Sequence, residues 1–344
     1  MPPADLRVNS TLKIEFTPAR ASKAARQSLT AVVSHAFAPF TMSSVLRVSL
    51  RPSQSVGDVS APSEAILKLY DRRCMANIRG MYDETKPHDA SKELAYRQYL
   101  DDARKAKDAA CDFDDPLFFE ERDVSDGEFE GYIEHQCRQM FDAECSTYRH
   151  LLELQGQLIP RLHGTVEYIP PPMIANNGTE IVMDPIPGIL VEYIPSITLR
   201  NLVQTWRTLD PPLSLDILCS VADSATAVIE RISDYSVLNE DVRLDNMLVR
   251  QPLFTGNAAS NNASMENLVP NPCVLIDLAQ CRLRREDETD EDWRAVKWSQ
   301  DEAGAIGFVL AGLINKHLGE GVWTYQRSMR YYRPLEESDE ANTR

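Results

Sequence analysis

The feature that most restricts the fold is a long amphipathic helix predicted over residues 125–156. Ser125 and Glu128 have the spacing of a capping box, and Gly156 is a natural helix stop. Glu144 lies on the apolar stripe of this helix, so the fold must provide a partner for its carboxylate. The apolar stripe consists of Phe129, Ile133, Cys137, Phe141, Tyr148 and Leu152.

Two other charged residues interrupt apolar elements in the same way. Lys68 lies at the centre of the predicted strand "AILKLYD" (65–71), and Asp277 ends the predicted strand "CVLID" (273–277). Because burying an isolated charge is unfavourable by several kcal/mol, each needs a partner or a solvent-filled cleft. An ion pair between Lys68 and Glu144 is the simplest mutual solution. The alternative is that Lys68 extends from an edge strand to solvent and Glu144 marks the margin of its stripe.

The remaining elements follow from the periodicity of apolar residues. Residues 71–127 are charged and poor in aliphatic side chains, so they are predicted to form a solvated insertion with room for some helix. The other predicted elements are strands within 12–50 and at 188–194, helices at 213–232 and 301–319, and a hairpin that joins 247–249 to 273–277.

Composition excludes several classes of protein. The formal net charge is −16, which disfavours nucleic acid as the main partner because phosphate binding needs a basic surface. No apolar run is long enough for a membrane span, and the N-terminus lacks the pattern of a secretory signal. The seven cysteines form no CxxC pair, so neither a zinc site nor a disulfide framework is indicated. We therefore expect a cytoplasmic or nuclear protein without nucleic-acid or membrane partners.

The stretch "LNEDVRLDNMLV" (238–249) places Asp241 and Asn246 five residues apart, with Arg243 between them. The chain thus presents, in order, a strand lysine, a helix glutamate, an apolar strand, a helix, an Asp-x4-Asn loop and a strand-terminal aspartate. In this order it resembles the protein-kinase superfamily, and in particular the divergent kinase-like proteins that are common in fungi. The resemblance covers roughly residues 40–334.

The resemblance implies an ATP site. Lys68 is similar to the lysine that holds the α- and β-phosphates, and Glu144 is similar to its helix partner. The segment "VEYI" resembles the hinge that binds adenine. There the Glu192 carbonyl and the Ile194 amide would contact adenine, and Val191 would be the gatekeeper.

The resemblance also implies a catalytic set. Asp241 is similar to the catalytic-loop base and Arg243 to the cation on the γ-phosphate, whereas Asn246 and Asp277 resemble the magnesium ligands. These residue types suit the chemistry, because metal ions that neutralise phosphoryl oxygens need hard oxygen ligands. An aspartate beside the acceptor hydroxyl can position it and take its proton.

The fold that this resemblance implies is α+β and bilobal, with a small antiparallel-sheet lobe that carries one long helix and a larger, mainly helical lobe. ATP would bind between the lobes. The expected parts are an N-terminal segment with possible strands (1–39), an N-lobe with an acidic insertion at 71–127 (40–191), a C-lobe (192–334) and an acidic tail (335–344).

Two functions from different classes remain open. The first is an ATP- and Mg-dependent phosphotransferase that acts on a hydroxyl of a protein or a small molecule. The second is a pseudokinase, a binding or scaffold module with weak or no catalysis. Departures from the family pattern favour the second: Asn239-Glu240 replaces His-Arg, Leu278-Ala279 replaces Phe-Gly, and Gly57 is the only glycine before Lys68.

Overall fold

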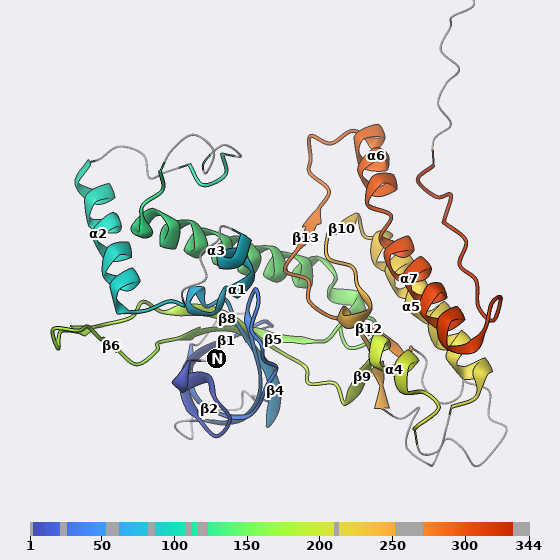
Figure 1. Ribbon diagram of the computed structural model, residues 1–344, viewed down its shortest axis with the longest axis horizontal. Coiled ribbons are helices and arrows are strands. Elements are labelled where there is room, and N and C mark those ends of the chain that lie inside the picture. Colours follow the sequence, from blue (N-terminus) through green and yellow to red (C-terminus); the bar gives the residue numbers. More distant parts are fainter. Residues whose placement is uncertain are drawn as a thin grey trace, which may run out of the picture. The chain divides into compact units, whose positions relative to one another are not determined.

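The computed structural model divides the chain into two compact units. Unit 1 comprises Met1–Ser146 and Pro160–Tyr193, and unit 2 comprises Thr147–Ile159 and Ile194–Arg344. Figure 1 colours the chain from its N-terminus in blue to its C-terminus in red. The structure describes residues 3–20, 26–52, 62–81, 87–106, 112–115, 118, 123–209, 213–251 and 271–332.

Six antiparallel strands of unit 1 form a closed barrel (Figure 1). Closure comes from β1, which pairs with β2 on one side and with β5 on the other. Phe16 of β1, for example, lies opposite Val166 of β5. In barrel order the strands are β1 (Thr11–Pro18), β2 (Gln27–Ala36), β3 (Ser44–Pro52), β4 (Glu64–Leu69), β8 (Ile186–Val191) and β5 (Leu162–Tyr168).

Alternating side chains of these strands fill the barrel. On β4 the alternation directs Leu67 and Leu69 into the apolar core and Lys68 to the outer face. Gly188 lets β8 approach β4 closely, since a Cβ there would lie 2.5 Å from the Lys68 carbonyl oxygen. Other core residues are Leu12, Ile14, Phe16, Leu29, Ala31, Val33, Leu46, Val48, Ala65, Val166 and Leu190.

Helix α3 (Asp126–His150) is the long helix that the sequence predicts. Its capping box is present, because the Ser125 hydroxyl accepts the Glu128 amide at 3.3 Å and the Glu128 carboxylate accepts the Ser125 amide at 2.9 Å. The α-helix ends earlier than predicted and is followed by the short helix η3 (Leu152–Leu154). The other elements of unit 1 are η1 (Ala4–Leu6), η2 (Arg72–Cys74), α1 (Ala76–Met81), α2 (Ala90–Ala106) and the hairpin β6 (Met173–Ile174)–β7 (Glu180–Ile181).

The described residues of unit 2 form α-helices and small sheets. The predicted hairpin is confirmed: β11 (Met247–Arg250) pairs with β12 (Cys273–Leu275), and Met247 lies opposite Leu275. Strand β9 (Ser196–Thr198) pairs with the other side of β11. The remaining elements are α4 (Leu199–Thr205), α5 (Leu215–Ser233), β10 (Val237–Asn239), η4 (Leu244–Asn246), β13 (Cys281–Leu283), α6 (Asp290–Gln300) and α7 (Glu302–Leu318), with β10 paired to β13.

The predicted fold class, a bilobal kinase-like α+β domain with a small antiparallel-sheet lobe and a larger, mainly helical lobe, is wrong. The sheet of unit 1 is a closed barrel of six strands. The N-terminal segment at 1–39, in which strands were expected to be possible, contains β1 and β2, and both strands belong to the barrel. Strand periodicity shows which residues are extended, but it does not show that the first strand pairs with a strand about 150 residues later.

The expectation of a solvated insertion at 71–127 is also wrong in part. Its described residues include α1 and α2, and they bury the charged side chains of Arg72, Arg79 and Glu93. These charges compensate one another, so a charged segment need not be a solvated one. The other residues of the insertion, the glycine at position 57 and the tail at 335–344 lie outside the described residues.

Candidate functional site

The predicted partners Lys68 and Glu144 form a buried ion pair in unit 1. Lys68 Nζ lies 2.6 Å from Glu144 Oε2, and the two side chains are 7% and 2% exposed. The Tyr70 hydroxyl donates a hydrogen bond to the same carboxylate oxygen. Because side chains alternate along this segment, Lys68 and Tyr70 both face α3, while Leu69 between them points into the barrel. The ion pair compensates the two charges that the sequence left without partners.

The three residues predicted for the adenine site, the gatekeeper and the two that contact adenine, lie at the end of β8 and just after it. Val191 is buried and pairs with Ile66 of β4. Glu192 donates its amide to the Arg161 carbonyl at 2.9 Å, and its carboxylate accepts the Arg161 amide at 3.1 Å. Ile194 is the first residue of this segment that belongs to unit 2. Their role in nucleotide binding stays a prediction.

The loop predicted to carry catalysis is compact and lies within unit 2. The Asn246 amide nitrogen donates to the Asp241 carbonyl and to Asp241 Oδ2, both at 3.0 Å. Arg243 Nη2 lies 2.8 Å from the same Oδ2. The nitrogen of Asn246 therefore faces Asp241, which leaves the amide oxygen as the atom that can coordinate a cation. Arg243, predicted to bind the γ-phosphate, is paired with Asp241 and half exposed.

The hairpin brings Asp277 close to this loop. The Ile276 amide donates to the Asn246 carbonyl at 2.9 Å, which extends the pairing of β11 with β12. Asp277 follows directly, with a backbone φ of 62° in the left-handed region. Aspartate is one of the few non-glycine residues that adopt this region routinely. The four predicted residues Asp241, Arg243, Asn246 and Asp277 thus lie on one loop and the adjacent hairpin.

The left-handed backbone predicts that glycine is tolerated at least as well as alanine at position 277, the reverse of the order in a helix. Asp277→Gly and Asp277→Ala both remove the carboxylate, so the difference between them reports the backbone. We expect the glycine variant to be at least as stable as the alanine variant, because left-handed backbone costs an alanine about 1 to 2 kcal/mol. At the exposed helical residue Asp101, alanine should instead be more stable than glycine by about 1 kcal/mol. Urea unfolding of the four variants measures both differences, and an alanine advantage at 277 would contradict the assignment.

Two residues that the sequence does not single out hold the strand before the loop. Glu302, the first residue of α7, accepts the Asn239 amide on Oε1 at 2.7 Å. Lys297 of α6 donates to Glu302 Oε2, to the Val237 carbonyl at 2.8 Å and to the Ser233 hydroxyl at 2.9 Å. Strand β10 is therefore fixed at both of its ends by one buried ion pair.

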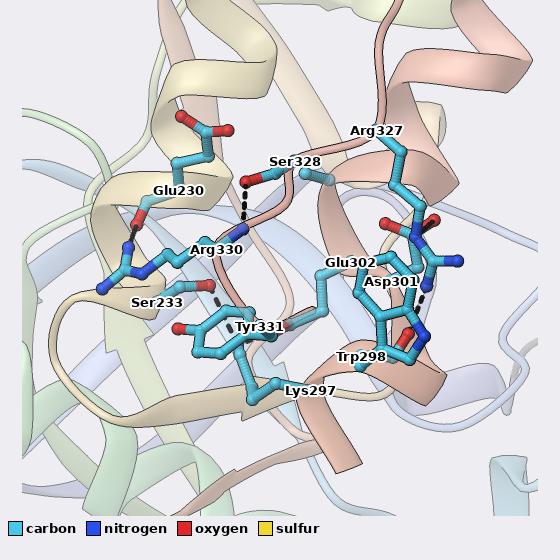
Figure 2. A pocket seen from close by; sticks show the side chains of 11 residues that line it. Glu230, Ser233, Lys297, Trp298, Asp301, Glu302, Arg327, Ser328, Arg330 and Tyr331 are labelled. Atoms are coloured by element: carbon cyan, nitrogen blue, oxygen red, sulfur yellow. Dashed lines mark hydrogen bonds and ion pairs between the residues drawn. The ribbon is translucent and has the colours of Figure 1, made fainter. Parts of the chain in front are cut away.

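This ion pair acts on Asp241 through Asn239. The Asn239 side-chain oxygen accepts the Asp241 amide at 2.9 Å, so the contacts run from Lys297 through Glu302 and Asn239 to Asp241. Burial, and after it the charge of Arg330, lower the pKa of Lys297 from its ordinary value to about 7. Lys297 and Glu302 border a cavity of about 30 Å³ (Figure 2). Glu302 resembles an ordinary acidic residue of a first helical turn, which hides its role in the sequence.

The residues predicted to bind magnesium are one carboxylate, from Asp277, and one amide, from Asn246. Across the described part of the chain, no three His, Cys, Asp or Glu side chains form a group that could hold a metal ion. Magnesium in nucleotide sites commonly uses only one or two protein oxygens and takes its other ligands from phosphates and water. The role of this pair as magnesium ligands stays a prediction.

Comparisons with known proteins do not assign a family: no family model matches the chain, and no curated protein matches it. Among the described residues, no helix combines the length and the apolar character needed to cross a membrane. Function is therefore inferred from the site residues and their contacts.

Proposed function

We propose that the chain is an ATP- and Mg-dependent phosphotransferase that transfers the terminal phosphoryl group of ATP to a hydroxyl of a protein or a small molecule. The observation that carries the proposal is the geometry of the 241–246 loop. Asn246 holds the carboxylate of Asp241 through its nitrogen, and its oxygen is the atom left for a cation. A loop that holds a carboxylate beside a possible metal ligand in this way suits in-line transfer between two oxygens.

Each residue has a defined task in this proposal. Asp241 positions the acceptor hydroxyl and takes its proton as the new P–O bond forms and ADP leaves. Asn246 and Asp277 hold the magnesium ion that accompanies ATP. Lys68, fixed by Glu144, binds the phosphates, and Arg243 stabilises charge on the transferred group once it exchanges Asp241 for phosphate.

Nucleotide binding is tested by thermal unfolding. We expect ATP with magnesium to raise the Tm in a concentration-dependent way, because a ligand at 100 times its Kd stabilises the folded state by about 2.7 kcal/mol. Replacing magnesium with EDTA should reduce the shift. If ATP raises the Tm neither with magnesium nor with EDTA, the proposed nucleotide binding is wrong.

A matched variant tests whether Lys68 takes part. Lys68→Met/Glu144→Gln removes both charges and keeps the side-chain volumes, so the protein should stay folded. We expect this variant to need a higher ATP concentration for the same Tm shift. An unchanged ATP dependence would exclude Lys68 from the nucleotide site.

One observation favours a second function, a binding module with weak or no catalysis. The carboxylate of Asp241 is paired with Arg243 and Asn246, so a catalytic base would first have to leave the arginine. The two functions differ in turnover: the phosphotransferase releases ADP from ATP, and the binding module does not.

A further inference from the structure

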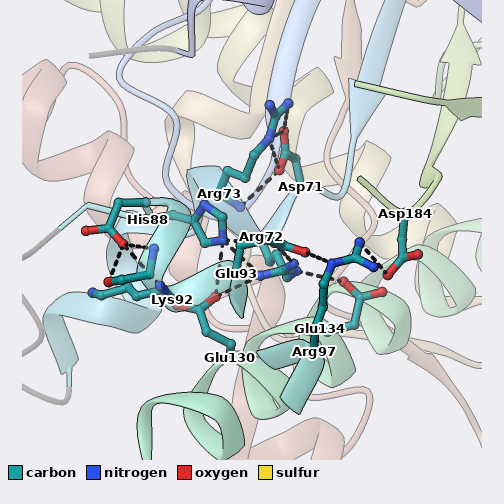
Figure 3. Close-up of polar contacts among 12 residues, drawn as sticks. Asp71, Arg72, Arg73, His88, Lys92, Glu93, Arg97, Glu130, Glu134 and Asp184 are labelled. Carbon is teal, nitrogen blue, oxygen red and sulfur yellow. Dashed lines mark hydrogen bonds and ion pairs between the residues drawn. The ribbon is translucent and has the colours of Figure 1, made fainter. Parts of the chain in front are cut away.

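A buried cluster of charged side chains lies where the segment after β4 meets α2 and α3 (Figure 3). Arg72 and Arg79 are 6% and 4% exposed, and their carboxylate partners Glu93 and Glu130 are 0% and 1% exposed. All four belong to unit 1. So many buried charges in one place need an explanation, because burial without compensation is strongly unfavourable.

The cluster is held together by charge-assisted hydrogen bonds. Arg79 binds Glu130 with both terminal nitrogens, at 2.6 and 2.8 Å. Arg72 donates to the same carboxylate at 3.1 Å and also to Glu93 of α2. Arg72 Nη1 lies 2.9 Å from His88 Nε2, and because a guanidinium can only donate, this imidazole nitrogen is the acceptor.

The carboxylate of Glu93 is stabilised as an anion. Burial by itself would raise the pKa of Glu93, but the interactions of its carboxylate with His88 and Arg72 outweigh burial and hold the pKa at about 2. A buried network of paired charges favours the arrangement of its elements that brings those charges together. Here those elements are η2, α1, α2 and α3.

The cluster and the Lys68–Glu144 pair both contact α3. Lys68, Tyr70 and Arg72 stand at alternate positions, and all three direct polar atoms at α3. The first two contact Glu144, and the third contacts Glu130, about four helical turns away and on nearly the same face. Helix α3 is therefore fixed at two separate points by a single segment of the chain.

We propose that Arg72 and Arg79 are positioning residues that hold α3 in the register at which Glu144 reaches Lys68. The insertion that carries them thereby controls how well Lys68 is fixed for phosphate binding, and this last step rests on the proposed function. Close packing of α2 on α3 supports the same role, since a Cβ at Gly127 would lie 2.4 Å from the Ala95 carbonyl oxygen.

The test separates positioning from general stability. Arg79→Met/Glu130→Gln removes the two-pronged contact and leaves Arg72 with the carboxylate of Glu93. A control, Asp101→Asn/Arg104→Met, removes an exposed ion pair of α2. Hydrogen exchange of α3 peptides that include Glu144 is measured for both, together with the apparent Kd for ATP from the Tm shift.

In the cluster variant Arg79→Met/Glu130→Gln, we expect hydrogen exchange near Glu144 to become at least tenfold faster. The Kd for ATP should rise at least tenfold. Peptides of β1 and β2 should keep their protection from exchange. The control should match the unaltered protein in every respect. Unchanged exchange of α3 in the folded cluster variant would overturn the inference. If that variant does not fold, Arg79→Lys serves instead, because lysine keeps the charge but cannot make the two-pronged contact.

The two proposals fail in different ways. If the unaltered protein shows no ATP-dependent Tm shift, the proposed function fails, and hydrogen exchange still decides whether the cluster holds α3. If ATP binds and α3 exchange is unaffected by Arg79→Met/Glu130→Gln, the positioning role fails and the proposed function stands.

Discussion

Glu302→Leu should lower the free energy of unfolding by about 3 to 5 kcal/mol, because it leaves the ammonium of Lys297 buried without its counter-charge. The substitution also removes the acceptor of the Asn239 amide, which is itself buried. Both losses act on β10, so the loss of stability should exceed that caused by replacing an exposed charged residue. Urea unfolding at neutral pH measures it.

The double variant Lys297→Met/Glu302→Gln is the informative comparison. It removes both charges, and the glutamine oxygen can still accept the Asn239 amide. Since replacement of a buried ion pair by neutral groups of similar volume is often nearly neutral, most of the lost stability should return. Asp287→Asn, at an 83% exposed side chain, is the control and should change stability by less than about 0.5 kcal/mol. A Glu302→Leu effect as small as this control would contradict the role given to the pair.

Asp241→Asn should reduce ATP turnover by about 10² to 10⁴-fold, the usual contribution of a general base. The amide keeps the size of the side chain but cannot take the proton of an acceptor. The ATP-dependent Tm shift should persist, since phosphate binding is assigned to other residues. ADP release under saturating ATP and magnesium provides the measurement.

Asp245→Asn is the matched control for this loss. Asp245 lies on the same loop, is 48% exposed and pairs with Arg200 at 2.8 Å, so its charge has no assigned part in transfer. We expect its turnover to stay close to that of the unaltered protein. Equal turnover in the Asp241 variant and the unaltered protein would mean that Asp241 is not the base. A protein that binds ATP but never releases ADP would instead be the binding module.

Local elements could be predicted from the sequence because their signals are local. The capping box at Ser125 and Glu128 starts α3 as expected, and the strand pairs 247–249 and 273–275 form the expected hairpin. Closure of the barrel could not be predicted, because it depends on the pairing of β1 with β5, and periodicity within a strand carries no information about a distant partner.

In the candidate site too, some residues could be predicted from the sequence and others could not. Lys68 and Glu144 could be paired from the sequence because each interrupts an apolar pattern and needs compensation. Arg72 and Glu302 could not, because they stand among other charged residues, where a buried charge and a solvated one look alike. Only the contacts of these two residues distinguish them from surface residues.

The pairing of β1 with β5 and of β4 with β8 also has a consequence for synthesis on the ribosome. The first three strands can meet as a meander soon after they emerge, but the ring cannot shut until the chain has been made through Val191. Until then the free edge of β4 has no partner strand, and the free edge of β1 has none until β5 has been made, as in other folds dominated by distant contacts. Chains truncated before residue 186 should therefore expose unpaired strand edges and depend on chaperones. In the complete barrel these edges are paired.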